Sequence, residues 1–400
     1  MSTSQAPAPT VNADRAIKLV MQLMAIPGKS GEEGAVTEFV VKHLRDAGVK
    51  RSALRWDRAH KRSPIGGAVG NLILQLPGTS SSPRRLLMAH LDTVPLCVGA
   101  KPQRRGPVVR SANPRTALGA DDRAGVGVVL QTALEILRRR LPHPPLTFFW
   151  PVQEEVGLYG ARYADLNLLG RPALCFNWDG GPPAIYSAGA TGSFELDIEI
   201  AGLASHAGGA PERGVSAVAI AGLAIAELHR TGWHGLVKHK GLRGTSNIGI
   251  IQGGDATNVV TDRLTIVAEA RAHDRGLRRR IVAAYRTAFE RAPRQVRSSE
   301  GARGRVRFVA THKYESFELP ERAACVRKVR RVLSALGVKP QRRISNGGLD
   351  ANWMTERGLP TVTLGCGMSK VHTVKEALIL KEYLQACRVG LALATDWPST

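Results

Sequence analysis

Hydrophobic residues recur at intervals of three and four in several stretches of the chain, a pattern that predicts amphipathic helices. The first two helices are expected over residues 15–24 and 32–47, and a longer one over 125–140. Ser30 precedes the second helix and Glu33 follows three residues later. This spacing predicts a capping box, in which the two side chains bond the free N–H groups at the helix start.

Short apolar runs between these helices predict strands. They cover residues 71–76, 85–89 and 146–152. Strands that alternate with helices are typical of an α/β domain whose sheet is mostly parallel and has helices on both faces.

The pattern changes after Asp179. Glycine and proline mark residues 180–190 as a linker, and residues 194–200 then alternate with a period of two, as in a half-exposed antiparallel strand. The insert that follows is predicted to contain helices 216–230 and 277–291 and strands 245–251, 264–271 and 306–310. From residue 320 the alternation returns, with a strand over 359–364 and a final helix over 375–393.

We therefore predict one α/β domain that is interrupted by a smaller α+β domain. Residues 1–13 are expected to be a disordered leader, 14–189 and 312–400 the two parts of the α/β domain, and 190–311 the insert.

The chain is strongly basic, with 56 Lys and Arg against 33 Asp and Glu, a formal charge of +23. Such a charge is typical of nucleic-acid or membrane-surface partners, but it also follows from general arginine enrichment. The arginines are scattered and only 5% of residues are aromatic, so a nucleic-acid partner is not expected. Five well-separated cysteines, no signal peptide and no apolar run of about 20 residues favour a cytoplasmic protein without membrane contact.

Acidic and histidine residues stand at or just after the ends of the predicted strands. By itself, each cluster has an ordinary alternative role as a surface turn or a helix cap. Paired carboxylates at a buried strand end, however, are costly without a cation to hold them. Together the clusters supply two histidines and at least three carboxylates, which suit zinc or a similar metal, and one spare glutamate that could serve as a base. The residues are His90, Asp92, Asp121, Asp122, Glu154, Glu155, Asp179 and His372.

Seven ordered motifs resemble those of the di-zinc metallopeptidases of family M20, which include peptidase T, aminoacylase and succinyl-diaminopimelate desuccinylase. The resemblance extends from about residue 19 to the last helix. The motifs are His90-Leu91-Asp92-Thr93-Val94-Pro95, Gly119-Ala120-Asp121-Asp122, Glu154-Glu155, Asp179, Ser205-His206-Ala207-Gly208, Gly254-Asp255-Ala256-Thr257-Asn258-Val259-Val260, and His372 ahead of Glu376.

The resemblance implies a zinc-exopeptidase catalytic domain with two zinc ions, although cobalt and manganese also suit these ligands. Asp121 would bridge the ions, and the peptide bond after it is expected to be cis. Asp92 would orient His90, and Glu154 would be the base that takes a proton from the bridging water. One ion would be held by His90, Asp121 and Asp179, and the other by Asp121, Glu155 and His372.

By the same resemblance the insert is a lid and dimerisation domain, so a homodimer is expected. His206 would reach the partner subunit's site and stabilise the oxyanion, and Asn258 would bond the substrate. Arg271 is a candidate for binding a substrate carboxylate, with a solvated strand face as the alternative. Asp350, in a loop that shapes the substrate end of the cleft in the family, could instead cap the following helix.

Within the family the chain looks most like the peptidase T branch. That branch removes the N-terminal residue from short peptides, mainly tripeptides. The alternative within the family is hydrolysis of N-acyl or carbamoyl amino acids, or of dipeptides. A binding scaffold that has lost activity would be expected to lack a ligand or the base, and none is missing here.

Overall fold

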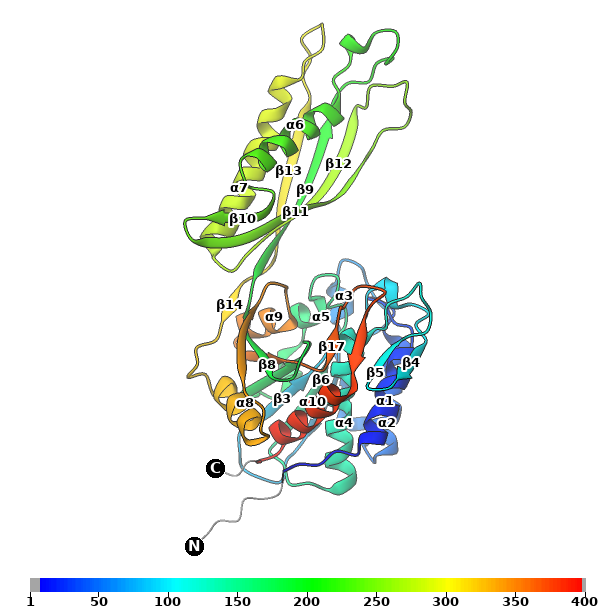
Figure 1. Ribbon diagram of the computed structural model, residues 1–400, viewed down its shortest axis with the longest axis vertical. Helices are drawn as coiled ribbons and strands as arrows, with labels where there is room; N and C mark the ends of the chain where they lie inside the picture. The colour runs from blue at the N-terminus through cyan, green and yellow to red at the C-terminus, as the bar shows by residue number, and fades with distance from the viewer. Residues whose placement is uncertain (1–7, 398–400) are drawn as a thin grey trace. The chain divides into compact units, whose positions relative to one another are not determined.

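The structure is a computed structural model that describes residues 8–397 and divides into two compact units (Figure 1). Unit 1 holds the described residues up to Gly189, Glu318–Ile344, and those from Leu349 onward. Unit 2 holds Ala190–Phe317 and Ser345–Gly348. The expected boundary at 311/312 is wrong, because strand β13 (Arg305–Tyr314) stays paired with β9 across it. Of the expected leader, residues 1–7 lie outside the described residues.

The main sheet of unit 1 has the order β1-β2-β6-β3-β7-β16-β8-β14, with β15 also paired to β8. Its centre, β6-β3-β7-β16, is parallel, and β1, β2 and β8 pair antiparallel to their neighbours. The α/β class is confirmed, but the linker expected over 180–190 contains strand β8. The bounds are β1 Leu54–Trp56, β2 Leu72–Leu76, β3 Arg85–Met88, β6 Leu146–Trp150, β7 Leu174–Trp178, β8 Ile185–Ala190, β14 Phe317–Glu318, β15 Gln341–Ser345 and β16 Thr361–Leu364.

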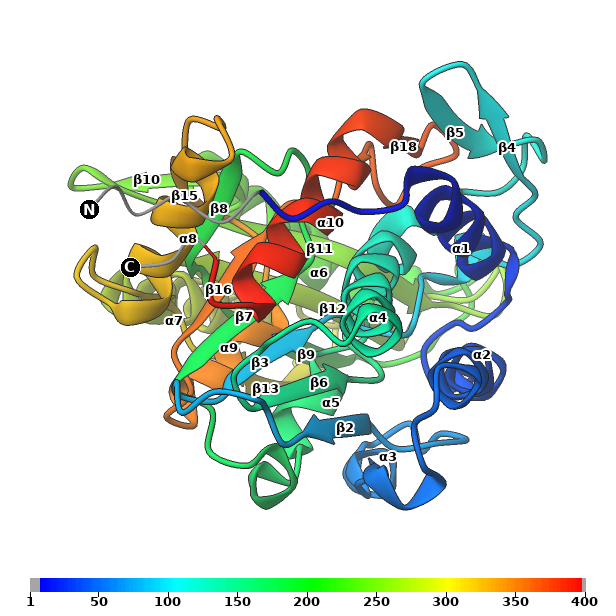
Figure 2. The same cartoon turned by 90° about the horizontal axis from the view of Figure 1, so that it is seen from below.

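Helices cover both faces of this sheet (Figure 2). Helix α4 packs against β3, β6 and β7 and lies beside α1 and α10, while α5 and α9 contribute to a core cluster with Leu86, Met88 and Phe149. No helix among residues 8–397 is both long enough and apolar enough to cross a lipid bilayer. The bounds are α1 Ala13–Ala25, α2 Gly34–Asp46, α3 Ala59–Arg62, α4 Ala120–Arg139, α5 Tyr159–Tyr163, α8 Ala324–Ala335, α9 Asp350–Glu356 and α10 Leu380–Ala394.

The last helix begins at Leu380, later than expected, because residues 377–379 form a strand instead. This strand, β18 (Ala377–Ile379), pairs with β17 (Met368–Ser369) on one side and with β5 (Val108–Ser111) on the other, and β4 (Pro102–Arg105) completes the small sheet. The backbone hydrogen bonds of these pairings replace those of the first helical turn. The loop between β17 and β18 carries His372.

Unit 2 is a five-stranded antiparallel sheet in the order β10-β11-β12-β9-β13. Every second side chain of β9 and β12, for example Ile198 and Ile266, points into a core formed with α6 and α7, to which α7 contributes Ile281. The other face of the sheet is more exposed and mixes polar side chains, such as Glu199, with the apolar Ile250 and Val309. The bounds are β9 Gly192–Ala201, α6 Ala217–Arg230, β10 Gly235–His239, β11 Leu242–Gly253, β12 Arg263–Ala272 and α7 Arg275–Arg291.

We predict that Phe149→Ala lowers the free energy of unfolding by about 3–5 kcal/mol. Phe149 is fully buried in β6, between Ile73 of β2 and Met88 of β3, so truncation leaves a cavity beneath the edge that carries the acidic residues. Urea denaturation followed by circular dichroism measures the change. Ile65→Ala is the control, because Ile65 is half exposed and its truncation should cost less than about 1 kcal/mol. A comparable loss in both variants would contradict the prediction.

Candidate metal centre

Three neighbouring strands at the centre of the main sheet end at the same edge. His90 follows β3, Glu154 and Glu155 follow β6, and Asp179 follows β7. Because these strands are parallel, their carboxyl ends bring the four side chains to one region, where open α/β sheets hold their ligands. Asp121 joins them from the first turn of α4.

Asp121 lies between two histidines. Its Oδ1 is 3.3 Å from Nε2 of His90, and its Oδ2 is 3.2 Å from Nε2 of His372. The same Nε2 of His372 is 3.0 Å from Oε1 of Glu155. His90, Asp121 and Glu155 each offer a ligand atom within 4.8 Å of the others. Asp179 lies outside this tight group, although Asp121 and His90 still influence its pKa.

The donor set fits divalent metal ions. Oδ1 of Asp121 is buried without a hydrogen bond, so it has an acceptor lone pair to give. Zinc binds nitrogen and oxygen ligands at about 2.0–2.2 Å, which leaves two ligands of one ion roughly 3.3 Å apart. The separations of 3.0–3.3 Å between histidine nitrogens and carboxylate oxygens agree with that value.

Burial and mutual repulsion dominate the electrostatics of the cluster. Burial raises the pKa of Glu154 and of Asp179 well above the usual carboxyl range, and neighbouring acids raise both further. Burial alone would lower the pKa of His90, but the carboxylates of Asp121 and Asp92 beside its two ring nitrogens raise it well above its usual value. The same kind of contact with Asp121 and Glu155 raises the pKa of His372 to about 10. The raised pKa values reflect a negative electrostatic potential in the cluster, and such a potential also attracts metal cations.

Asp92 connects His90 to the loop that carries the two glutamates. Its Oδ1 lies 3.3 Å from Nδ1 of His90, on the side of the ring away from Asp121. Its carboxylate also accepts hydrogen bonds from the backbone N–H of Glu154 at 3.0 Å and of Glu155 at 3.2 Å. A carboxylate in this position orients a metal-binding imidazole and keeps Nε2 free for the ion.

The turn before α4 has unusual backbone geometry. The peptide bond between Asp121 and Asp122 is cis, which confirms the expectation. Asp122 is fully buried and accepts hydrogen bonds from the backbone N–H of His90 at 3.3 Å and of Gly125 at 3.1 Å. Asp122 therefore supports the backbone at His90 and does not face the cluster as a ligand.

The other predicted site residues belong to unit 2. His206 is exposed, and its Nδ1 accepts hydrogen bonds from the backbone N–H of Gly208 at 3.1 Å and of Gly209 at 2.9 Å. An acceptor nitrogen carries no proton, so Nε2 is the protonated nitrogen and is available as a donor. Asn258 lies on the adjoining segment, where its backbone carbonyl accepts from Ala207 N–H at 2.8 Å.

Arg271 lies on β12 and borders a hollow of about 340 Å³ within unit 2, together with Arg243 and His273. Its guanidinium forms an ion pair with Glu269 at 2.7 Å. The position suits recognition of an anion, and the ion pair means that Glu269 competes for the same group.

A model of Peptidase family M20/M25/M40 matches residues 86–396, which is most of the chain and includes all ten predicted site residues. The chain belongs to this family. It is a metal-dependent hydrolase of the peptidase type.

Similar proteins span almost the whole of this M20 peptidase. The uncharacterized protein YqjE of Bacillus subtilis is 28% identical over 387 residues, covering 96% of this chain and 99% of YqjE. Among solved structures, a tripeptidase from Staphylococcus aureus is 28% identical with a TM-score of 0.83, covering 96% of this chain and 100% of that one. Aminopeptidase PepT from Bacillus cereus is 28% identical with a TM-score of 0.79, covering 96% and 98%.

Ser30 and Glu33 do not form the expected capping box. The Ser30 hydroxyl donates to Asp92 at 2.6 Å, and Glu33 accepts from the backbone N–H of Gly31 at 2.8 Å and of Gln153 at 3.1 Å. The N-cap of α2 is Glu33 itself, without a side-chain bond to the helix. Both side chains instead reach loops of the metal centre of this M20 peptidase, because Asp92 contacts His90 and Gln153 directly precedes Glu154.

Two further acids near the centre had no firm role in the sequence. Glu376 accepts three backbone N–H bonds in the turn before Asp121. Asp350 begins α9 but caps nothing, since both of its buried oxygens lack a hydrogen-bond partner. Burial raises the pKa of Asp350 to about 7, and the charges at His90 and Asp92 also act on it. In the sequence, the only sign that Glu376 and Asp350 belong to the site was their position in or next to motifs of the family.

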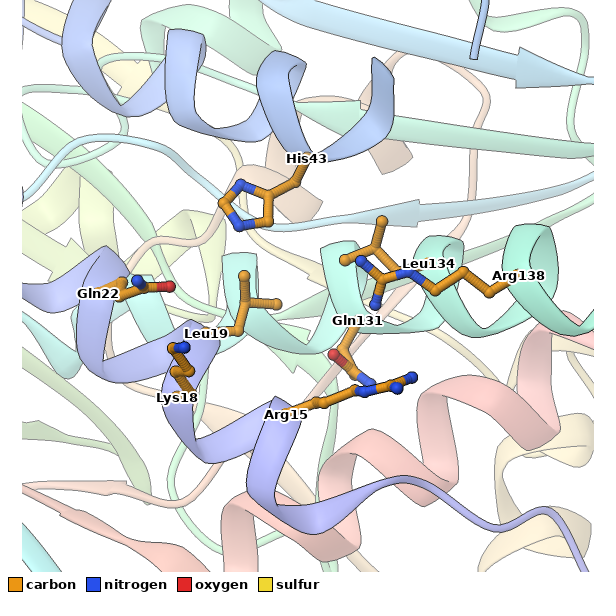
Figure 3. A pocket seen from close by; sticks show the side chains of 8 residues that line it. All are labelled: Arg15, Lys18, Leu19, Gln22, His43, Gln131, Leu134 and Arg138. Atoms are coloured by element: carbon orange, nitrogen blue, oxygen red, sulfur yellow. The ribbon is translucent and has the colours of Figure 1, made fainter. Parts of the chain in front are cut away.

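A separate hollow of about 560 Å³ lies among α1, α2 and α4 (Figure 3). Three basic side chains, those of Arg15, Lys18 and Arg138, line it together with His43 and the apolar Leu19 and Leu134. None of the predicted metal ligands lines this hollow. The hollow is therefore distinct from the metal centre. The basic side chains around it contribute to the positive charge of the chain.

We predict that Glu33→Gln removes a pH-dependent loss of stability. Burial raises the pKa of Glu33 to about 7 from 4.5. As pH rises between these values, Glu33 ionises in the unfolded state before it does so in the folded state. The free energy of unfolding of the wild type therefore falls by roughly 2–3 kcal/mol and changes little at higher pH. Glutamine keeps the acceptor that serves Gly31 and Gln153, and its amide replaces an oxygen without a hydrogen bond.

Urea midpoints of both metal-free proteins near pH 5 and pH 8 test this difference. The urea midpoint of the variant should rise relative to that of the wild type as pH rises. The contributions of the other titrating groups are the same in both proteins and cancel in the comparison. Two parallel pH profiles would refute it.

Proposed function

We propose that this M20 peptidase removes the N-terminal residue from short peptides, tripeptides above all, by two-metal hydrolysis. The observation that carries the chemistry is Asp121 held between His90 and His372, with Glu154 and Glu155 on the adjoining strand end. The near full-length similarity to a tripeptidase and to aminopeptidase PepT supports the substrate class.

Zinc is the metal that we propose, with cobalt or manganese able to replace it, because imidazole and carboxylate ligands suit all of these ions. Asp121 would bridge the two ions, since its oxygens face different histidines. His90 and Asp179 would complete one ligand set, and Glu155 and His372 the other.

When bound, two such ions would polarise the scissile carbonyl and lower the pKa of a water molecule beside it. Glu154 takes the proton from that water and delivers it to the leaving amine. Glu154 is adjacent to the proposed ligand Glu155 and therefore lies at the metal centre, but neither proposed ligand set includes it. Burial raises the pKa of Glu154, which favours holding the proton between the two transfers.

Asp92 and His206 assist this chemistry from different units. Asp92 holds the tautomer of His90 in which Nε2 is free, and its bonds to the N–H groups of Glu154 and Glu155 keep the base in register with the ligand. His206 presents a protonated Nε2, which suits it to stabilise the oxyanion. Asn258 and Arg271 would bind the substrate backbone and a carboxylate.

We propose that unit 2 forms a homodimer. Two exposed apolar features support this. Val218 and Leu223 lie on the outward face of α6, and Ile250 and Ile251 lie on β11 beyond the part of it that pairs with β10. An unpaired edge with exposed isoleucines is a template for pairing with a second copy, and apolar helix faces are commonly buried in dimers.

We expect the zinc- or cobalt-loaded protein to release the first residue of unblocked tripeptides. Glu154→Gln should lower kcat by at least about 100-fold, because the amide cannot accept the proton. Amino-acid release from tripeptides, dipeptides and N-acyl amino acids is measured in parallel, with the exposed Glu38→Gln as control. Cleavage of the acylated compounds alone would reject the aminopeptidase assignment. Two bound metals without any cleavage would indicate a binding scaffold.

We also expect complementation between His206→Asn and Glu154→Gln. If His206 serves the partner's centre, each parent dimer is inactive, but a mixed dimer has one complete centre. Random mixing makes half of the dimers mixed, so activity should return to about a quarter of the wild-type value. Tripeptide hydrolysis before and after subunit exchange measures this. Failure to recover activity in a mixture with proven exchange would show that His206 acts within its own subunit or not at all.

A further inference from the structure

Glu376 lies at the base of the loop that carries His372, directly before β18. It is 2% exposed. Its Oε2 accepts hydrogen bonds from the backbone N–H groups of Leu118 and Gly119, both at 2.8 Å, and its Oε1 accepts from the N–H of Asp121 at 3.0 Å. One carboxylate therefore ties the segment that carries His372 to the turn that carries Asp121.

Within the described chain, the His372 side chain has few other constraints. It is 48% exposed, and its Nε2 contacts Asp121 and Glu155. Asp121 and Glu155 are proposed ligands of the same ion as His372. Once that ion binds, these atoms would contact the ion and no longer each other, so these contacts cannot be what positions the imidazole ring. The backbone at His372 has φ 60°, an uncommon conformation that the surrounding loop must hold.

The loop transmits the position of Glu376 to His372. The N–H of Glu376 donates to the carbonyl of Thr373 at 3.0 Å, which closes a tight turn immediately after His372. On the other side, Ser369 pairs with Ala377, so both ends of the loop are held next to Glu376. A shift of Glu376 would therefore move the imidazole.

A carboxylate suits this position better than any neutral side chain. Burial beside Asp121 disfavours a negative charge, and burial raises the pKa of Glu376 accordingly. Three N–H donors offset that cost. An amide has the same shape, but only one of its two terminal atoms accepts hydrogen bonds, so it must leave either one donor or two without a partner.

We propose that Glu376 is a positioning residue that sets the spacing between His372 and Asp121 and thereby prepares the second metal position. The inference rests on the proposed two-metal function. It assigns Glu376 no contact with the metal or the substrate.

Metal binding to Glu376→Gln tests this role directly. Metal-free protein is dialysed against buffered Co²⁺ of increasing free concentration, and bound cobalt is measured by elemental analysis and by visible absorption. The wild type should bind two ions per chain. The variant should bind one ion with the wild-type affinity and the other at least about 10-fold more weakly. Glu38→Gln is the matched control, an exposed glutamate of α2 that should leave both affinities unchanged.

Activity at saturating metal provides the second measurement. Excess Co²⁺ should restore kcat of Glu376→Gln toward the wild-type value without a change in KM, because a positioning defect in the metal site can be overcome by mass action. A residue that serves only general stability would lower the melting temperature and leave both metal affinities equal to those of the wild type. That outcome overturns the proposal.

If Glu376→Gln does not fold, the same titration on Glu376→Asp decides the question. The shorter carboxylate keeps the charge but cannot reach all three donors, so selective weakening of one ion supports the proposal and unchanged affinities overturn it. A wild type that binds only one ion overturns the two-metal centre and this proposal together. Two bound ions without peptide hydrolysis defeat the proposed substrate and leave the role of Glu376 standing.

Discussion

The crowding of buried carboxylates at one edge of the parallel strands is the constraint on which the site depends. Burial makes the negative charges of Glu154, Asp121 and Asp179 more costly, and in addition Asp121 raises the pKa of Asp179 and Asp179 raises that of Glu154. Such an arrangement is stable only with cations and with N–H groups aimed at the oxygens. The histidines and the metals bound in this family supply the positive charge, and the surrounding backbone supplies the N–H groups.

Backbone N–H groups do much of that work. Asp92, Asp122 and Glu376 each accept at least two of them, and all of these donors except Gly125, which bonds to Asp122, come from distant segments of the chain. These bonds serve two purposes at once, because they compensate a buried charge and they fix the loop that donates the N–H. The ligands therefore belong to loops whose positions are set by other acids, and removal of a supporting acid should disturb the metals without any loss of a ligand.

The two units divide the proposed chemistry between them. Unit 1 holds the proposed metal ligands and the proposed base on a sheet edge where three parallel strands end together. Unit 2 holds His206, Asn258 and Arg271, and its antiparallel sheet has one face covered by helices and one exposed face. A peptide hydrolase needs groups that hold the substrate and its developing charge as well as groups that activate water, and the insertion of unit 2 supplies candidates for the former.

The sequence by itself determined the α/β class, the inserted domain, the family and the residues that form the cluster, because strand periodicity and ordered motifs are local signals. It also implied the cis bond after Asp121 through the family resemblance. It was wrong about Ser30 and Glu33, whose spacing satisfies a capping box although their partners are Asp92 and Gln153. It also extended the last helix through Glu376 and read β8 as a linker. Only the tertiary structure decided these points, since a side chain or strand chooses between a local partner and a distant one according to which the fold brings within reach, and one-dimensional spacing does not contain that information.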